Sequence, residues 1–564
     1  MFWDKILFDF IKQNYIYFIS YSSILLFMYP LEDLIIPKLF GKLYETIKDN
    51  STYGNPLNFV DNLKKMNTPG LMLLVVIIYI VVLAGDFIKY NIESSIIPGY
   101  LKYLRGLIFE GTVNKNQEDY KDVKSGEYMS KVLELTRSLR DIFQYTVSQF
   151  LPNISSVIII IIYLGYKIPE LLPVLVMSVI VVILLSIYSC EHIMTLTRER
   201  EHFFISELAE SINDKMQNMM NIVTNNEGTN VIKENVVLEQ KNADMMKGII
   251  ITESTYSSII HLFTLFTYAF CLFILYKMRV INRITGSDMI AYMLTMGKFL
   301  TSMHHVNWSI IFMLSFRIGI VTSHREYLED IFKYTDMKKT NVEFKDNSIT
   351  IKGLKYKYDE SNEHYLFDNL NMKISHNEKI GVVGRAGSGK TTLMRILVGL
   401  HTPSEGEIIV GQQNISKISK KDLRDQVNYV NQRTAMFNGD VIHNMQYAND
   451  KTEAEIVALL ERYQLTTLFS QLEKGVHNDV GVNGGKLSGG MQKVTMLVRG
   501  ICRSGNIVIF DEPLASIDEQ TGDKVMKMIL NECKDKTLII ITHDKKILPY
   551  MDRVININEF QKNK

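Results

Sequence analysis

The chain has 564 residues, 62 Lys and Arg against 61 Asp and Glu, and a hydrophobic content of 47%. This composition excludes an intrinsically disordered protein, and a net charge of +1 gives no overall field that would attract nucleic acid. The cysteines are far apart and form no C-x-x-C pair, so they predict neither a disulfide scaffold nor a zinc site. They are Cys190, Cys271, Cys502 and Cys533.

Six apolar stretches in the first part of the chain are long enough to cross a membrane. A helix needs about 20 mostly apolar residues to cross roughly 30 Å of hydrocarbon, where it must satisfy its own backbone. The stretches lie near residues 14–44, 68–90, 142–166, 169–190, 254–278 and 289–320. We expect an all-α, six-helix transmembrane domain over residues 1–335, because short and long connections alternate too regularly for buried helices of a soluble protein.

Two long polar connections, residues 86–141 and 191–253, have few of the Gly and Pro residues expected of loops. They predict helices that continue beyond the bilayer. Both are rich in Lys and Arg, a bias that points to the cytosol. We therefore expect a multi-pass integral membrane protein whose C-terminal part is cytosolic, in a membrane that the sequence does not identify.

Several ionisable residues fall inside these stretches, where charge is costly and usually faces a cavity or a partner. They are Glu32, Asp33, Lys298, His304 and His305. One interpretation is a polar path for a substrate. The alternative is that the histidines pack between helices and that the acidic pair lies near the outer surface; neither interpretation indicates a substrate class.

From about residue 340 the pattern changes to short apolar runs that alternate with amphipathic segments. This alternation predicts a mostly parallel sheet with helices on its faces. We expect residues 340–564 to form an α/β P-loop NTPase domain.

A complete P-loop, or Walker A motif, lies between a predicted strand and a predicted helix. Its glycines let the backbone wrap phosphates, and the helix start offers free N–H groups to them. We expect Lys390 to reach the β- and γ-phosphates of ATP and the Thr391 hydroxyl to bind Mg²⁺. The motif and its flanking residue comprise Gly384, Arg385, Ala386, Gly387, Ser388, Gly389, Lys390, Thr391 and Thr392.

The second motif is a pair of acidic residues that follows the buried run Ile507–Phe510. Its two carboxylates, Asp511 and Glu512, come at the end of a predicted parallel strand, where phosphoryl-transfer chemistry requires them. We expect Asp511 to hold Mg²⁺ and Glu512 to polarise the attacking water. The sequence thus predicts ATP hydrolysis.

Between these motifs stands Leu487-Ser488-Gly489-Gly490, and with it the chain resembles the ATP-binding cassette (ABC) family. The resemblance implies that Tyr358 stacks on adenine and that Gln432 is the Q-loop glutamine, which contacts the metal and the catalytic centre. It also implies that Asp518 is the D-loop aspartate and His543 the catalytic switch histidine, whereas Ser488, Gly489 and Gly490 contact nucleotide.

The whole chain resembles a half-size ABC exporter, which implies ATP-driven export by alternating access. Because such a chain carries one set of motifs, the resemblance implies a homodimer with composite ATP sites in a lipid bilayer; a heterodimer with another half remains the alternative. Two alternative functions remain: an importer on the same fold, or an ATP-gated regulator or channel without net pumping. The sequence does not indicate the transported substrate. Two positions depart from the family pattern. Met491 stands where the family usually has Gln or Glu, and Val482 stands where exporters usually have Glu.

Overall fold

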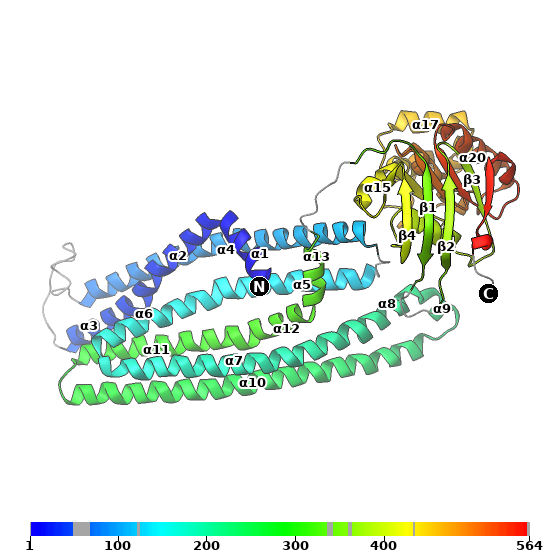
Figure 1. The fold of residues 1–564 in the computed structure, drawn as a ribbon. Helices are drawn as coiled ribbons and strands as arrows, with labels where there is room; N and C mark the ends of the chain where they lie inside the picture. Colours follow the sequence, from blue (N-terminus) through cyan, green and yellow to red (C-terminus); the bar gives the residue numbers. More distant parts are fainter. Residues whose placement is uncertain are drawn as a thin grey trace. The chain divides into compact units, whose positions relative to one another are not determined.

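The computed structural model describes residues 2–48, 68–120, 125–334, 342–358, 364–432 and 435–560. The chain divides into two compact units, described separately below (Figure 1). The first comprises Met1–Gly111 and Asp122–Thr335, and the second comprises Thr112–Lys121 and Asp336–Lys564.

The first unit is all helical. Its helices, in chain order, are α1 (Phe2–Gln13), α2 (Tyr15–Pro30), α3 (Ile36–Lys48), α4 (Thr68–Glu118), α5 (Ser125–Tyr145), α6 (Leu151–Lys167), α7 (Leu172–Phe203), α8 (Glu210–Gln217), α9 (Met219–Thr224), α10 (Gly228–Val280), α11 (Gly286–Trp308), α12 (Ser315–Ser323) and α13 (Arg325–Phe332). Some of them join through π-helical segments, so that α2 and α3 form one continuous rod through Leu31–Ile35.

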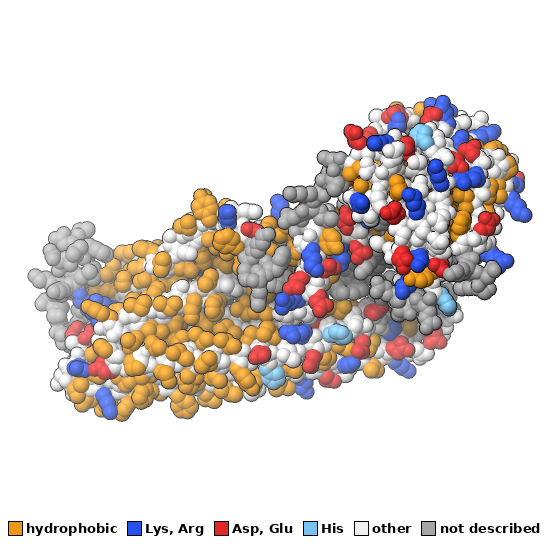
Figure 2. Space-filling model, viewed as in Figure 1, with side chains coloured by type: hydrophobic (Ala, Val, Ile, Leu, Met, Phe, Trp, Pro, Cys, Tyr) orange, Lys and Arg blue, Asp and Glu red, His pale blue; other side chains and the backbone are white. Residues whose placement is uncertain are grey.

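Six rods are long and apolar enough to cross a membrane, which confirms the predicted number of spans. They run over Tyr15–Ile47, Thr68–Glu118, Val132–Lys167, Pro169–Gln217, Gly228–Val280 and Gly286–Ser323. Figure 2 shows hydrophobic side chains covering one continuous length of these helices, with charged side chains gathered beyond it. An exposed apolar belt of this kind is what a helix bundle presents to lipid.

The long polar connections are helical, as predicted. The 53 residues of α10 rise about 1.5 Å each and so extend about 80 Å, more than twice the thickness of a bilayer core. α7 packs beside α10 along its length (Figure 1). The excess length places the charged ends of these helices outside the apolar belt.

The second unit is an α/β domain, as predicted, and it has a second sheet beside the predicted parallel one. One is antiparallel, with the order β2 (Phe367–Ile374), β1 (Ile349–Tyr356), β4 (Glu405–Val410) and β5 (Gln413–Asn414). The other is parallel, with the order β6 (Val427–Val430), β7 (Ile507–Asp511), β8 (Thr537–Ile541), β3 (Lys379–Val383) and β9 (Arg553–Asn556). The helices are α14 (Lys390–Leu397), α15 (Lys420–Gln426), α16 (Val441–Gln446), α17 (Glu453–Arg462), α18 (Thr466–Phe469), α19 (Gly489–Cys502) and α20 (Glu519–Glu532).

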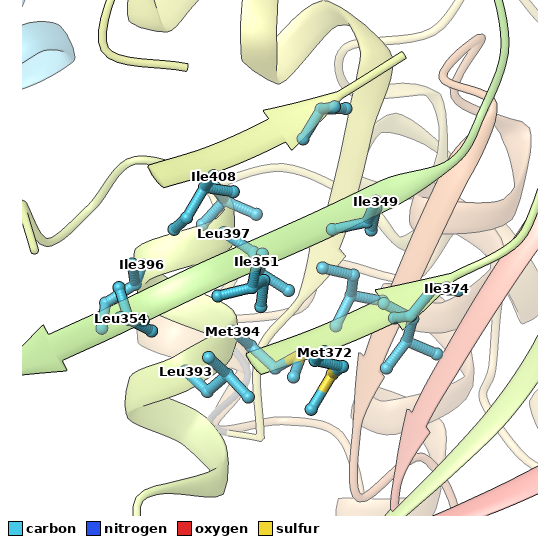
Figure 3. Close-up of a cluster of buried hydrophobic side chains, with 14 of the residues drawn as sticks. Ile349, Ile351, Leu354, Met372, Ile374, Leu393, Met394, Ile396, Leu397 and Ile408 are labelled. Atoms are coloured by element: carbon cyan, nitrogen blue, oxygen red, sulfur yellow. The ribbon is translucent and has the colours of Figure 1, made fainter. Parts of the chain in front are cut away.

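Helix α14 is anchored in the main hydrophobic core of this unit, next to the antiparallel sheet (Figure 3). Its apolar residues, Leu393, Met394, Ile396 and Leu397, are at most 1% exposed and pack with Ile351 and Ile408 of the sheet. Burying side chains of this size contributes about 1.5–3 kcal/mol each. The core therefore fixes the start of α14, where the P-loop ends.

Candidate active site

The loop between β3 and α14 has the backbone conformation of a phosphate cradle. Gly387 and Gly389 have φ of +77° and +87°, which side-chain-bearing residues rarely adopt. A Cβ atom at Gly389 would lie 2.7 Å from Phe367 Cζ, whereas one at Gly387 would have nothing within 4 Å. Gly387 therefore borders open space, and the loop presents backbone N–H groups and a helix start to an anion there.

Lys390 lies inside this cradle and is 7% exposed. Its Nζ donates hydrogen bonds to the carbonyls of Gly384 at 2.9 Å and Arg385 at 3.0 Å. Burial lowers the pKa of Lys390, while the carboxylates of Glu512 and Asp511 act in the opposite direction. A phosphate group in the cradle would supply this buried ammonium with an anionic partner.

Asp511 ends β7 and is 2% exposed. Its Oδ2 accepts hydrogen bonds from Thr391 Oγ1 at 2.8 Å and from the Tyr429 hydroxyl at 3.3 Å. Burial raises the pKa of Asp511, and both hydrogen bonds oppose that rise. A hydroxyl and a carboxylate oxygen side by side are the hard oxygen ligands that Mg²⁺ prefers, so these residues fit the metal that the motif implies.

Glu512 follows directly, with φ of +50°, an unusual conformation for a residue with a side chain. Its carboxylate accepts a hydrogen bond from Gln432 Nε2 at 3.0 Å and lies 3.5 Å from His543 Nε2. The three residues follow β6, β7 and β8, which are neighbours in the parallel sheet. The carboxyl ends of parallel strands meet at one edge, and this places the three polar groups together.

These groups line one pocket of about 420 Å³. It contains most of the predicted site residues: Tyr358, Ala386, Gly387, Ser388, Gly389, Lys390, Thr391, Thr392, Gln432, Asp511, Glu512 and His543. Tyr358 is 64% exposed, and its hydroxyl is hydrogen-bonded to Thr392, so its ring stands at the pocket's rim. The arrangement unites a glycine-rich loop with an open face, a hydroxyl and a carboxylate of the kind that hard metals prefer, and the Glu512 carboxylate between Gln432 and His543.

The remaining predicted residues are not among those that line this pocket. They are Gly384, Arg385, Ser488, Gly489, Gly490 and Asp518. Gly384 still takes part through its carbonyl, which binds Lys390. Ser488 caps α19, where its Oγ accepts from the Met491 N–H at 3.3 Å, and Asp518 caps α20. Ser488, Gly489 and Asp518 are exposed.

Three further residues belong to the site although the sequence did not single them out. Leu366 lines the pocket, Tyr429 binds Asp511, and Lys493 reaches the backbone behind the carboxylates. Tyr429 lies next to β7 through the pairing of Tyr429 with Ile509. No sequence signal identifies Lys493, because its position depends on how α19 packs.

Four of the ionisable residues predicted within the spans, Glu32, Asp33, Lys298 and His304, have side-chain partners on other helices of the first unit. Lys298 forms an ion pair with Glu32 at 2.5 Å, and Ser156 Oγ donates to Asp33 at 2.5 Å. His304 Nε2 lies 3.0 Å from Thr264 Oγ1. His305 differs from these residues, because it is exposed and the contact with Ser309 involves only its backbone carbonyl. These contacts join helices or neighbouring turns, and they indicate no ligand chemistry.

Comparison with known proteins matches both units. The family model described as the ABC transporter transmembrane region matches residues 19–303, and the model described as ABC transporter matches residues 367–515. The chain is 30% identical over 247 residues to the glutathione/L-cysteine transport system ATP-binding/permease protein CydC of Haemophilus influenzae, and this match covers 43% of each chain. The chain thus spans less than half the length of that relative.

Longer matches have lower identity. A protein of Rickettsia prowazekii, named as an export ATP-binding/permease protein, is 22% identical over 512 residues, which cover 88% of this chain and 86% of the relative. A solved structure of a bacterial Atm1-family ABC exporter with ATP bound has a TM-score of 0.85 at 15% identity, covering 97% of this chain and 93% of that one. With a transmembrane region followed by one nucleotide-binding domain, the chain belongs to the ABC transporter family and has its half-size organisation.

Proposed function

We propose that two copies of this chain form an exporter driven by ATP hydrolysis. One observation carries the proposal. The pocket holds the P-loop and the catalytic carboxylate, whereas Ser488 and Gly489 of the signature segment are exposed outside it. A signature segment that does not reach its own pocket is available to close the pocket of a second chain, and twofold symmetry then completes two sites.

The chemistry follows from the pocket. The P-loop N–H groups and Lys390 would bind the phosphates of ATP. Thr391 and Asp511, with Gln432, would hold Mg²⁺, which when bound neutralises developing phosphate charge. Glu512 would polarise the attacking water, while Gln432 and His543 hold its carboxylate in place.

Nucleotide binding would drive transport by linkage. ATP that contacts both chains binds the closed pair more tightly than the open pair and therefore shifts the population toward closure. Residues 112–121, at the end of α4, belong to the second unit, where the Gln117 carbonyl accepts a hydrogen bond from Arg424. The last turns of α4 thus belong to the second unit, and they would carry closure toward the apolar part of the same helix.

Outward transport is supported by the export function in the name of the Rickettsia prowazekii relative. The polar residues of the bundle favour no chemical class of substrate, so the test compares several classes.

The test is reconstitution of the full chain in proteoliposomes, with ATP hydrolysis measured beside the Glu512→Gln variant. Candidate lipids, peptides, amphipathic drugs and glutathione conjugates would be added one at a time. Hydrolysis that one class stimulates, with uptake of that class into vesicles whose nucleotide domains face outward, would support export. ATP-dependent loss of the compound from the same vesicles would instead indicate an importer, and binding without hydrolysis would indicate a regulator.

A further inference from the structure

Lys493 is a buried lysine of α19 that the chemistry above does not use. Its side chain is 3% exposed, one turn beyond Ser488, the residue that caps the helix. Among the residues that the structure describes, no carboxylate forms an ion pair with it. A buried ammonium without an ion pair is costly, so an apolar or neutral residue would be the more stable choice if packing were its only role.

The Lys493 ammonium joins two backbone segments of the site. Its Nζ donates to the carbonyl of Gln432 and to the carbonyl of Asp511, each at 3.4 Å. The Asp511 carbonyl ends β7 and the Gln432 carbonyl lies two residues beyond β6; the two strands are paired as far as Val430 and Phe510. One side chain therefore bridges the backbone where the two strands separate.

The same two segments carry the catalytic hydrogen bond. Gln432 Nε2 donates to Glu512 Oε2 at 3.0 Å, and Glu512 follows Asp511 directly. The relative position of the two backbone segments therefore affects whether these side chains can meet. A change in the position of Lys493 would therefore alter how the Glu512 carboxylate is held.

Helix α19 connects Lys493 rigidly to the signature segment. Ser488 caps the helix, and Lys493 is five residues further along the same helix. A force that nucleotide exerts on Ser488 would be transmitted along the helix to Lys493, because buried side chains such as Val494 and Leu497 hold the helix in a close-packed core that transmits strain.

We propose that Lys493 is a positioning residue that couples the signature segment at one ATP site to the catalytic groups of the other. The inference rests on the proposed dimer, in which Ser488 contacts the partner's nucleotide while Gln432 and Glu512 face the chain's own. Nucleotide at one site then adjusts the base at the second site through α19 and Lys493. The expected consequence is positive cooperativity between the two sites.

The test uses the reconstituted full chain and three variants. Lys493→Met retains the length of the side chain but removes its hydrogen bonds, and Lys493→Gln retains a neutral donor. Thr495→Val is the matched control, because Thr495 is buried in α19 and its hydroxyl bonds only to the Met491 carbonyl of its own helix, at 2.8 Å. ATP hydrolysis is measured against ATP concentration, together with ATP binding and thermal unfolding.

We expect Lys493→Met to lower kcat at least tenfold, with KM for ATP changed less than twofold and the Hill coefficient reduced toward one. Lys493→Gln should restore most of kcat and of the cooperativity, and Thr495→Val should resemble the wild type. Unchanged kcat and cooperativity in Lys493→Met would overturn the proposal, as would equal losses in the Met and Gln variants. Lower thermal stability that accounts for the loss of activity in both would show a structural role only.

The failure of this inference differs from the failure of the proposed function. A wild-type chain that hydrolyses ATP without cooperativity overturns the coupling and leaves the ATPase intact. A wild-type chain that binds ATP but does not hydrolyse it overturns the proposed function, and the coupling with it.

Discussion

Replacement of Glu512 by Gln should remove catalysis while preserving the site. The side chain is isosteric, and the pocket offers it equivalent partners. The amide oxygen can accept from Gln432 Nε2, where the carboxylate accepts at 3.0 Å, and the amide N–H₂ can face His543 Nε2, which lies 3.5 Å away. Because both neighbours keep a partner, we expect folding to change by less than about 0.5 kcal/mol, as for an ordinary surface substitution.

The catalytic loss should be large, because an amide cannot accept the proton of the attacking water. A positioned general base contributes about 10²–10⁴ in rate. At about 1.36 kcal/mol for each factor of ten, this corresponds to about 3–5 kcal/mol of the barrier. Hydrolysis should fall by that factor in proteoliposomes, while ATP binding is retained and the closed dimer accumulates. Turnover at the wild-type rate would refute the assignment of Glu512 as the base.

Other substitutions test separate features. Ser488→Arg should leave ATP binding at the chain's own P-loop unchanged and lower hydrolysis more than tenfold, because the bulky side chain would block the partner's site; unchanged hydrolysis would argue against composite sites. Gly500→Ala should destabilise the nucleotide domain by about 1–3 kcal/mol in thermal unfolding, since its Cβ would lie 2.2 Å from Val430 Cγ2; unchanged melting would show that α19 shifts without cost. Hydrogen bonds from Thr452 and Lys451 lower the pKa of Glu455 from 4.5 to about 2. The ionised Glu455 should therefore stabilise the folded domain above pH 4.5, and this contribution should be lost as the pH falls toward 2. The difference in melting temperature between Glu455→Gln and the wild type should shrink over that interval, and a constant difference would contradict the shift.

Hydropathy alone predicted the membrane unit because lipid imposes one strong requirement on the chain. Each span must satisfy its own backbone, so span number and length follow from composition. The π-helical segment Leu31–Ile35 was not predictable, since a local change of helical repeat depends on how neighbouring helices pack. The same holds for the partners of Glu32 and Asp33, which lie on α11 and α6, far away in the sequence.

The nucleotide pocket was predictable to the extent that its residues lie in local motifs. The P-loop and the Asp511–Glu512 pair each follow a strand, and strand order brings their ends to one edge. Lys493 and Tyr429 reach the same edge through packing and register, which no local pattern encodes. The residues that we propose to contact nucleotide therefore lie in local motifs that the sequence reveals, whereas Lys493 and Tyr429 emerged from the structure.

The two departures from the family pattern have different physical meanings. Met491 is 5% exposed and packs in the core beneath the signature segment, so its side chain is occupied within its own domain. Its backbone N–H still donates to the Ser488 Oγ that caps α19, a contact that does not depend on the Met491 side chain. Val482 is 81% exposed, and an apolar side chain on the surface loses the charge that a glutamate would offer to a partner. The change at Met491 is therefore accommodated inside the nucleotide domain, whereas the change at Val482 alters the surface. We expect any effect on the coupling of ATP hydrolysis to transport to come from Val482.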